Sequence, residues 1–209
     1  NENNLKEVAN LYHKSSITLL IAGGLLFLLI NVNVKDLYVL INKPEYSVGV
    51  LIVLMISVSE LYKLALGTNG AILSNSKYYR VYFYLSIAMA VSVIILNKWL
   101  IEMMGINGAA LATLLVVLLF STFKIFYVKK KLQMQPFTAK TIMVLLLTFV
   151  LFLMFYFIEF PFHAILNILV KTAIITLIYF LIIFRLNISE EVNVLMAQVL
   201  DKMKNPASK

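Results

Sequence analysis

"GINGAALATLLVVLLFSTFKIFYVKKK", residues 105–131, is the part of this chain that most clearly indicates its surroundings. It opens with small residues, continues as an apolar run, and closes on Lys129, Lys130 and Lys131. The apolar run, at about 106–128, is long enough to cross a bilayer core about 30 Å thick, which takes roughly 20 helical residues. Because a lysine run after such a segment is retained on the cytoplasmic side, the stretch predicts a transmembrane helix that ends at the inner face of a membrane.

Comparable apolar runs recur along the chain, at about 15–34, 47–66, 81–101, 141–158 and 164–184. They are continuously apolar, whereas the strands of a membrane barrel alternate between lipid-facing and lumen-facing residues, so they predict helices. The composition agrees, with 62% apolar and 13% charged residues against roughly 45–50% and about 25% in soluble domains. We expect an all-α integral membrane bundle of about six transmembrane helices, forming a single domain over residues 1–209.

The net charge of +8 is distributed unevenly between the connections. On the side shared by both termini lie Lys6, Lys14, Lys77, Arg80, Lys124, Lys129, Lys130, Lys131, Lys140, Arg185, Lys202, Lys204 and Lys209. Only Lys35, Lys43 and Lys98 fall on the other side, and Lys63 and Lys171 lie within spans. The positive-inside rule then predicts cytoplasmic termini. Topology and contact with anionic lipid account for the charge better than nucleic-acid binding does.

Two further segments have the pattern of amphipathic helices that lie on the membrane. The tail, about 188–204, repeats apolar residues at helical spacing, with Asn187 and Glu190 placed to cap its start. These apolar residues are Ile188, Val192, Leu195, Met196, Val199 and Met203. Near the start of the chain the pattern is shorter, with Leu5, Val8, Ala9 and Tyr12. We expect interfacial helices at both places, with docking to a partner as the alternative for the tail.

Small residues gather where the fourth expected span begins. Gly105, Gly108, Ala109 and Ala112 lie within two helical turns, and small side chains let helix backbones approach closely in lipid. Glycine also allows the chain to turn sharply between two adjacent helices. The pattern predicts a tight hairpin of the spans at 81–101 and 106–128, with direct substrate contact as the alternative.

Charged and amide side chains inside the spans are the candidates for a substrate or ion pathway, because each charge there costs about 2.5–3.5 kcal/mol. Glu60 and Lys63 lie three positions apart and can neutralise each other, although Lys63 can also reach the inner interface. Lys171 has no carboxylate within a helical turn, so snorkelling and a pathway role remain equally open. Asn97 completes the candidate set, but for it and Asn167 an interhelical hydrogen bond is the more conservative interpretation.

The stretch "VSVIILNKWLIEMMGINGAALATLLVVLL", residues 91–119, resembles the C-terminal hairpin of polysaccharide and O-antigen flippases, in the multidrug/oligosaccharidyl-lipid/polysaccharide exporter superfamily. The shared pattern is Ile-Leu-Asn, a short turn, and then Gly-Ile-x-Gly-Ala-Ala-x-Ala-Thr. Its positions are occupied by Asn97, Gly105, Gly108, Ala109, Ala110, Ala112 and Thr113. The resemblance covers about 43–130, and it departs from the family at Glu102, where proline is frequent in the turn.

Several expectations follow from this resemblance. Members of the family keep both ends in the cytoplasm and typically have 12 or 14 spans, so this chain would be the C-terminal lobe, with an N-terminal half preceding Asn1. Its function would be translocation of lipid-linked oligosaccharide across the bacterial inner membrane, for the biosynthesis of lipopolysaccharide O-antigen or another polysaccharide. Membrane lipids would be partners, and a proton or sodium gradient would be the drive, without a bound cofactor.

Two alternatives remain open at this stage. A multidrug or organic-cation antiporter of the same superfamily would favour an acidic cavity, for which Glu60 is the only well-placed carboxylate. A membrane enzyme that modifies lipid-linked sugars would need acids gathered at one interface, whereas the candidates are spread over different outer connections: Asp36, Glu45, Glu102 and Glu159. The absence of cysteine excludes thiol chemistry, and no pair of histidines with a carboxylate indicates a metal site. We therefore expect a transporter and not an enzyme.

Overall fold

The computed structural model describes residues 2–42, 49–194 and 198. Within them the chain forms helices and no strand, so the predicted all-α class is confirmed. The helices are α1 (Glu2–Ile41), α2 (Gly49–Ala65), α3 (Asn69–Ser74), α4 (Tyr79–Met104), α5 (Ile106–Leu132), α6 (Ala139–Tyr156) and α7 (Ala164–Arg185).

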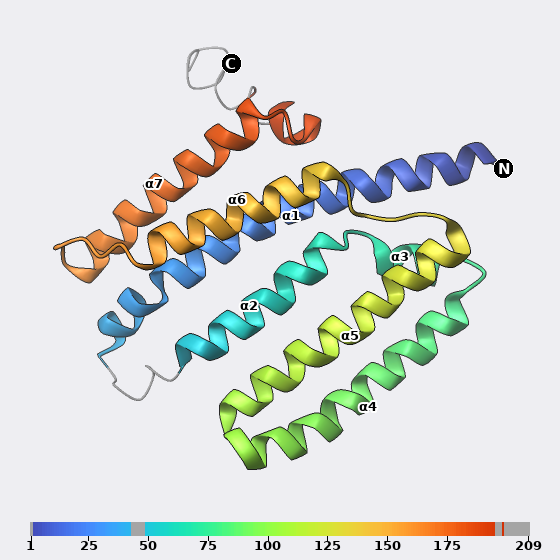
Figure 1. Ribbon diagram of the computed structural model, residues 1–209, viewed down its shortest axis with the longest axis horizontal. Coiled ribbons are helices and arrows are strands. Elements are labelled where there is room, and N and C mark those ends of the chain that lie inside the picture. Colours follow the sequence, from blue (N-terminus) through green and yellow to red (C-terminus); the bar gives the residue numbers. More distant parts are fainter. Residues whose placement is uncertain (1, 43–48, 195–197, 199–209) are drawn as a thin grey trace, which may run out of the picture.

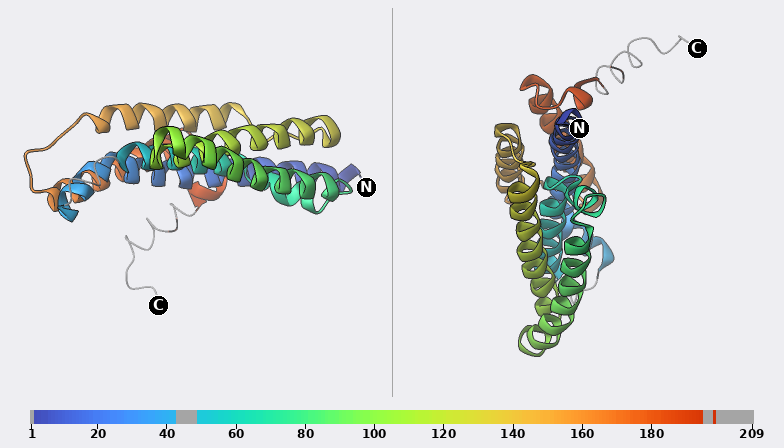
Figure 2. Two further views of the ribbon diagram at one scale, coloured as in Figure 1. Left: turned by 90° about the horizontal axis from the view of Figure 1, so that it is seen from below. Right: turned by 90° about the vertical axis from the view of Figure 1, so that its right-hand side faces the viewer.

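Helix α1 is the centre of the arrangement, with α2, α6 and α7 packed against it (Figure 1). On the other side of α2 lies α5, which pairs with α4, and the short α3 covers one end of that pair. Helices α6 and α7 make little contact with each other, since each packs on α1 instead. The bundle is therefore elongated and layered rather than round in section (Figure 2).

The two ends of the bundle differ in their connections. We call the end to the right in Figure 1 the basic end. Helix α1 begins there, and lysine and arginine residues border the connections α3–α4 and α5–α6 at this end. At the opposite end, the hairpin end, lie the turn between α4 and α5 and the connection between α6 and α7.

Five of the described helices are long and apolar enough to cross a membrane, namely α1, α4, α5, α6 and α7. The remaining expected span corresponds to α2, of which 17 residues are described. At 1.5 Å per residue these extend about 25 Å, and α2 runs between the hairpin end and the basic end, packed between α1 and α5 (Figure 1). The expected start of this span, residues 47 and 48, lies outside the described residues.

Helix α1 differs from the expected short approach helix followed by a span. It runs unbroken for 40 residues, because no glycine or proline interrupts it before Gly23 and both glycines there are accommodated within the helix. Tyr12 is fully buried beside Leu73 and Val128, and Asn69 Nδ2 donates a hydrogen bond of 2.6 Å to its hydroxyl. The first turns of α1 are therefore docked on α3 and α5, not laid separately on a membrane surface.

The α4–α5 hairpin turns at Gly105, which has φ of 60° and ψ of −142°, a conformation that favours glycine. Gly105 is exposed in this turn and takes no part in the helix contact. The contact is made by the buried Gly108 and Ala112, with Ala109 half-buried beside them. A methyl group added at Gly108 would collide with the carbonyl of Leu100 on α4, so the two backbones approach closely here because residue 108 has no side chain.

The first residues of the tail, where an interfacial helix is expected, pack on the bundle. Ile188 and Val192 are buried in the same core as α1 and α7. Ser189 Oγ, and not Asn187, accepts a hydrogen bond from the backbone of Val192 at the start of the helical turn. The remaining apolar positions of the predicted tail helix, at 195, 196, 199 and 203, lie outside the described residues.

Candidate functional site

One face of α7 packs on α1 along its whole length. Its buried residues recur every four positions: Asn167, Lys171, Ile175, Tyr179 and Ile183. Toward the basic end this face is apolar. Tyr179 also links it to α1, because its hydroxyl donates a hydrogen bond of 3.0 Å to the Ile21 carbonyl. Toward the hairpin end the same face becomes polar, so Asn167 and Lys171 point at α1 and not at lipid.

The side chains of Lys171 and Asn167 both contact Asp36 of α1. Lys171 Nζ lies 2.9 Å from Asp36 Oδ2, and Asn167 Nδ2 donates a hydrogen bond of 2.9 Å to Asp36 Oδ1. The side chains of Lys171 and Asp36 are only 5% and 16% exposed. Lys171 has no carboxylate within a turn of its own helix, as the sequence indicates, and its partner comes instead from α1.

Asn33, one turn before Asp36, extends this polar contact. Its Nδ2 donates to Thr172 Oγ1 at 3.2 Å and to the Leu29 carbonyl at 2.8 Å. The Oδ1 atoms of Asn33 and Asn167 are both buried without a hydrogen-bond partner among the described residues. We call Asn33, Asp36, Asn167, Lys171 and Thr172 the α1–α7 polar cluster.

The surroundings of the cluster contain few other charges. Lys35 lies next to Asp36 in α1, but its Nζ sits 4.4 Å from the centre of the Tyr156 ring on α6. The other charged residues of the helices packed on α1 lie toward the basic end: Glu60 and Lys63 on α2, Lys140 on α6 and Arg185 on α7. Within the described parts of α1, α2, α6 and α7, the charged residues near Asp36 at the hairpin end are thus Lys35 and Lys171, and the ion pair is made by Lys171.

A buried ion pair is weak evidence for stability, because the desolvation of two charges offsets much of their attraction. Hydrophobic side chains of similar size would hold α7 on α1 at least as well. Ionisable residues inside membrane helices instead commonly mark ion or substrate pathways. The cluster is therefore the candidate functional site.

The other predicted pathway residues lie elsewhere. Glu60 and Lys63 form an ion pair on α2, but their side chains are 55% and 42% exposed. Asn97 lies on α4, where its Oδ1 is buried without a partner among the described residues, so this oxygen does not accept the expected interhelical hydrogen bond there. Of the four predicted residues, only Lys171 belongs to the polar cluster.

The acidic residues of the enzyme hypothesis do not gather at one place. Asp36 lies within α1 and faces α7, whereas Glu102 and Glu159 are exposed, the former in the last turn of α4. Glu45 lies outside the described residues.

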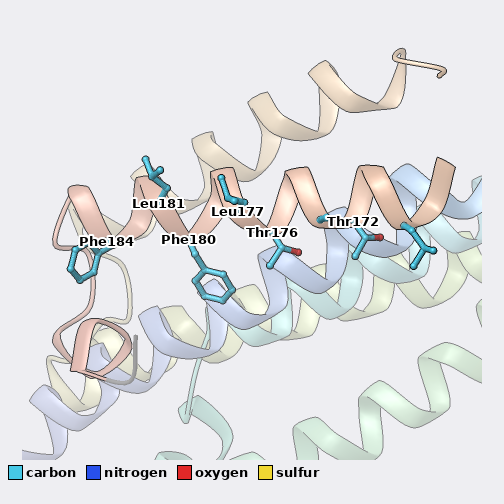
Figure 3. Close-up of a pocket in the computed structure, with 8 residues that line it drawn as sticks. Thr172, Thr176, Leu177, Phe180, Leu181 and Phe184 are labelled. Atoms are coloured by element: carbon cyan, nitrogen blue, oxygen red, sulfur yellow. The ribbon is translucent and has the colours of Figure 1, made fainter. Parts of the chain in front are cut away.

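A shallow groove runs along the side of α7 next to the polar cluster (Figure 3). Its volume is about 690 Å³, and its lining runs from Leu169 to Phe184, mostly leucine and phenylalanine. Thr172 belongs both to this lining and to the polar cluster. The cluster thus borders an apolar surface suited to the hydrocarbon chains of lipid.

Sequence reasoning missed Asn33 and the role of Asp36. Asp36 was assigned to an outer connection, because the apolar run ends near residue 34, but α1 continues to Ile41. The available signal was the spacing of four on α7, which places Asn167 and Lys171 on the same face as Ile175 and Tyr179.

The described helices and their buried charge pair define the class of this protein: a multi-pass membrane protein built as an α-helical bundle. Comparison with models of known protein families, with curated proteins and with solved structures found no match to this chain.

Proposed function

We propose that this chain is the C-terminal part of a flippase that moves lipid-linked oligosaccharide from the inner to the outer leaflet of the bacterial inner membrane. The observation that carries the proposal is the buried pair of Lys171 and Asp36 between two membrane helices. Such a pair is costly to bury, and ionisable residues within membrane helices commonly mark ion or substrate pathways. The hairpin pattern of residues 91–119, which resembles that of O-antigen and polysaccharide flippases, supports the choice of cargo.

The packing of the helices is compatible with alternating access. Helices α4 and α5 pack closely through Gly108, and α2 joins them to α1. Helices α6 and α7 pack on α1 but little on each other. The group α2, α4 and α5 and the pair α6 and α7 therefore meet at α1 and can move relative to each other as units. Many transporters expose a site alternately to the two sides of the membrane by such movements.

The proposed orientation puts the basic end in the cytoplasm. Lys77, Arg80 and the run Lys129–Lys131 border the connections at this end, and lysine and arginine are retained on the cytoplasmic side of bacterial membranes. The α4–α5 turn and the polar cluster would then lie toward the outer leaflet. Membrane lipids and an N-terminal half of the transporter are the proposed partners.

The charge of the described helices disfavours the two alternatives. An organic-cation antiporter would be expected to have unpaired carboxylates, but Asp36 and Glu60 are each paired with a lysine. A membrane enzyme would need several acids at one place, whereas Asp36 faces α7 and Glu102 lies at the end of α4.

Deletion of the gene for the full-length protein tests this proposal. Cells without the protein are expected to accumulate undecaprenyl-linked oligosaccharide repeat units and to lose surface polysaccharide. Plasmid-borne wild-type protein should reverse both effects. Normal surface polysaccharide in the deletion strain, or altered drug resistance alone, would refute the proposed function.

A further inference from the structure

We propose that a pocket at the basic end binds one anionic phospholipid, with the phosphate group at Lys77 and Lys131 and an acyl chain along the first turns of α1. This inference goes beyond the proposed function, because it concerns a second site and does not depend on the cargo.

The pocket lies where the start of α1, the short α3 and the end of α5 meet, to the right in Figure 1. Its volume is about 780 Å³. One of its lining residues, Met134, is buried in a single apolar cluster with Tyr12, Leu73 and Val128. The pocket therefore rests on packed side chains, and it is separate from the α1–α7 polar cluster at the hairpin end.

Two lysines give the pocket its charge. Lys77 lies in the connection between α3 and α4, and Lys131 lies in the last turn of α5, yet both line the same pocket. Neither forms an ion pair within the part of the chain that the structure describes. Lys77 Nζ lies 5.3 Å from the centre of the Tyr78 ring, a contact that leaves its charge without a counter-ion. The described lining contains no acidic residue, so the pocket complements an anion such as a phosphate group.

The wall that α1 contributes is apolar. Leu5, Val8 and Leu11 recur at a spacing of three on this wall, and they are 51%, 38% and 62% exposed. Ala9 and Tyr12 pack instead in the cluster with Leu73 and Val128. The apolar pattern predicted at the start of the chain thus divides into a docked part and an exposed part. An exposed apolar wall beside two lysines fits a molecule with a hydrocarbon chain and an anionic head.

The position of the pocket favours a lipid over a soluble phosphate compound. The proposed orientation places the basic end at the cytoplasmic surface of the membrane, where anionic headgroups are concentrated. A soluble phosphate compound would bind the lysines but leave the wall of Leu5, Val8 and Leu11 uncovered. The tail of the chain is a poor occupant, because residues 195–209 contain three lysines and one aspartate and so do not complement a basic pocket.

The helices around the pocket favour a resident phospholipid over the proposed cargo. A transported lipid needs a site that opens as the units of the transporter move. The lining of this pocket comes from α1, α3, α5 and their connections, and none of its described residues belongs to α6 or α7. Movement of α6 and α7 relative to the rest would therefore leave the pocket closed around its lipid.

Binding of fluorescent phosphatidylglycerol to the purified full-length protein in detergent tests the inference, with zwitterionic phosphatidylcholine of the same acyl chains as the reference probe. A lysine near an anionic lipid contributes about fivefold in affinity, so two lysines should give a preference of about 25-fold for phosphatidylglycerol. Lys77→Gln with Lys131→Gln should remove this preference. Lys6→Gln with Lys140→Gln is the matched control, because it removes two exposed lysines of the same end that do not line the pocket, and it should keep the preference.

All four substitutions are at exposed positions, so the variants should unfold at the same temperature as the wild type. Competition with unlabelled compounds then separates the possible occupants. Phosphatidylglycerol should displace the probe, whereas inorganic phosphate at the same concentration should not. Displacement by inorganic phosphate, or by undecaprenyl diphosphate at lower concentration than phosphatidylglycerol, would overturn the inference in favour of a free anion or the cargo. An equal preference of the wild type and the Lys77→Gln, Lys131→Gln variant would also overturn it. Export of polysaccharide is not measured in these assays, so their failure is distinct from failure of the proposed function.

Discussion

Lys171 and Asp36 lie 135 positions apart in the chain, yet their side chains meet at 2.9 Å in the contact between α7 and α1. The pair joins the last long helix of the described chain to the central one, at the end where α1 leaves the apolar core. Asn167 donates a hydrogen bond to Asp36, and the hydrogen bond from Asn33 to Thr172 lies beside the pair. Further along α7 the buried face becomes apolar, so the polar contacts between the two helices are concentrated around the pair.

Asp36→Leu should destabilise the protein strongly, because it leaves Lys171 buried without a counter-charge. Removal of one partner of a buried ion pair typically costs about 3–5 kcal/mol. The double variant Asp36→Leu with Lys171→Met should recover most of that loss, since two apolar side chains pack as well as the pair. Unfolding free energies in mixed micelles measure both, and additive costs in the double variant would show that the two residues do not interact.

Gly108→Ala should loosen the α4–α5 hairpin. The added methyl group would collide with the backbone carbonyl of Leu100, which cannot move without shifting α4. We expect a loss of about 1–3 kcal/mol, the usual cost of overpacking. Gly70→Ala is the matched control, because its methyl group would meet the Tyr82 hydroxyl only at ordinary contact distance. Equal unfolding midpoints for the two variants would contradict the close helix contact.

The pH dependence of the tail should depend on Glu191. A hydrogen bond from Lys14, at 2.9 Å, holds the pKa of Glu191 below its usual value. This contact therefore stabilises the docked tail above the ordinary glutamate pKa, and the stabilisation is lost as the pH falls through the lowered pKa. A spin label at Val194, which is exposed, should become more mobile over that acidic range. In Glu191→Gln the same transition should be absent; if it persists, another group controls the tail.

The proposed orientation can be read from single cysteine reporters, because the chain contains no cysteine of its own. Ile106, beside the α4–α5 turn, and Gln133, after the lysine run, are both exposed. In intact cells, a membrane-impermeant maleimide should label Ile106→Cys and leave Gln133→Cys unlabelled until the membrane is permeabilised. The reverse pattern would invert the topology.

The sequence predicted those parts of the structure that depend on residues close together in the chain. The apolar run after Ile106 and the lysines at its end predict helix α5 with nearly its observed bounds, and Gly105 predicts the sharp turn before it. These features follow from residues close together in the chain.

The candidate site could not be predicted in the same way, because its partners come from helices far apart in sequence. Lys171 has no carboxylate on its own face, and Asp36 lies beyond the apolar part of α1. Only the packing of α7 on α1 brings them together. Likewise, nothing local distinguishes the exposed pair of Glu60 and Lys63 from a buried one.

The most direct test of the central claim is export of surface polysaccharide by the full-length protein after neutralisation of one ion pair at a time. Asp36→Leu with Lys171→Met removes the buried pair, and Lys14→Gln with Glu191→Gln removes an exposed one. We predict that the first variant inserts at wild-type levels but accumulates lipid-linked repeat units, whereas the second exports normally. Normal export by the first variant would contradict a role of the α1–α7 polar cluster in transport.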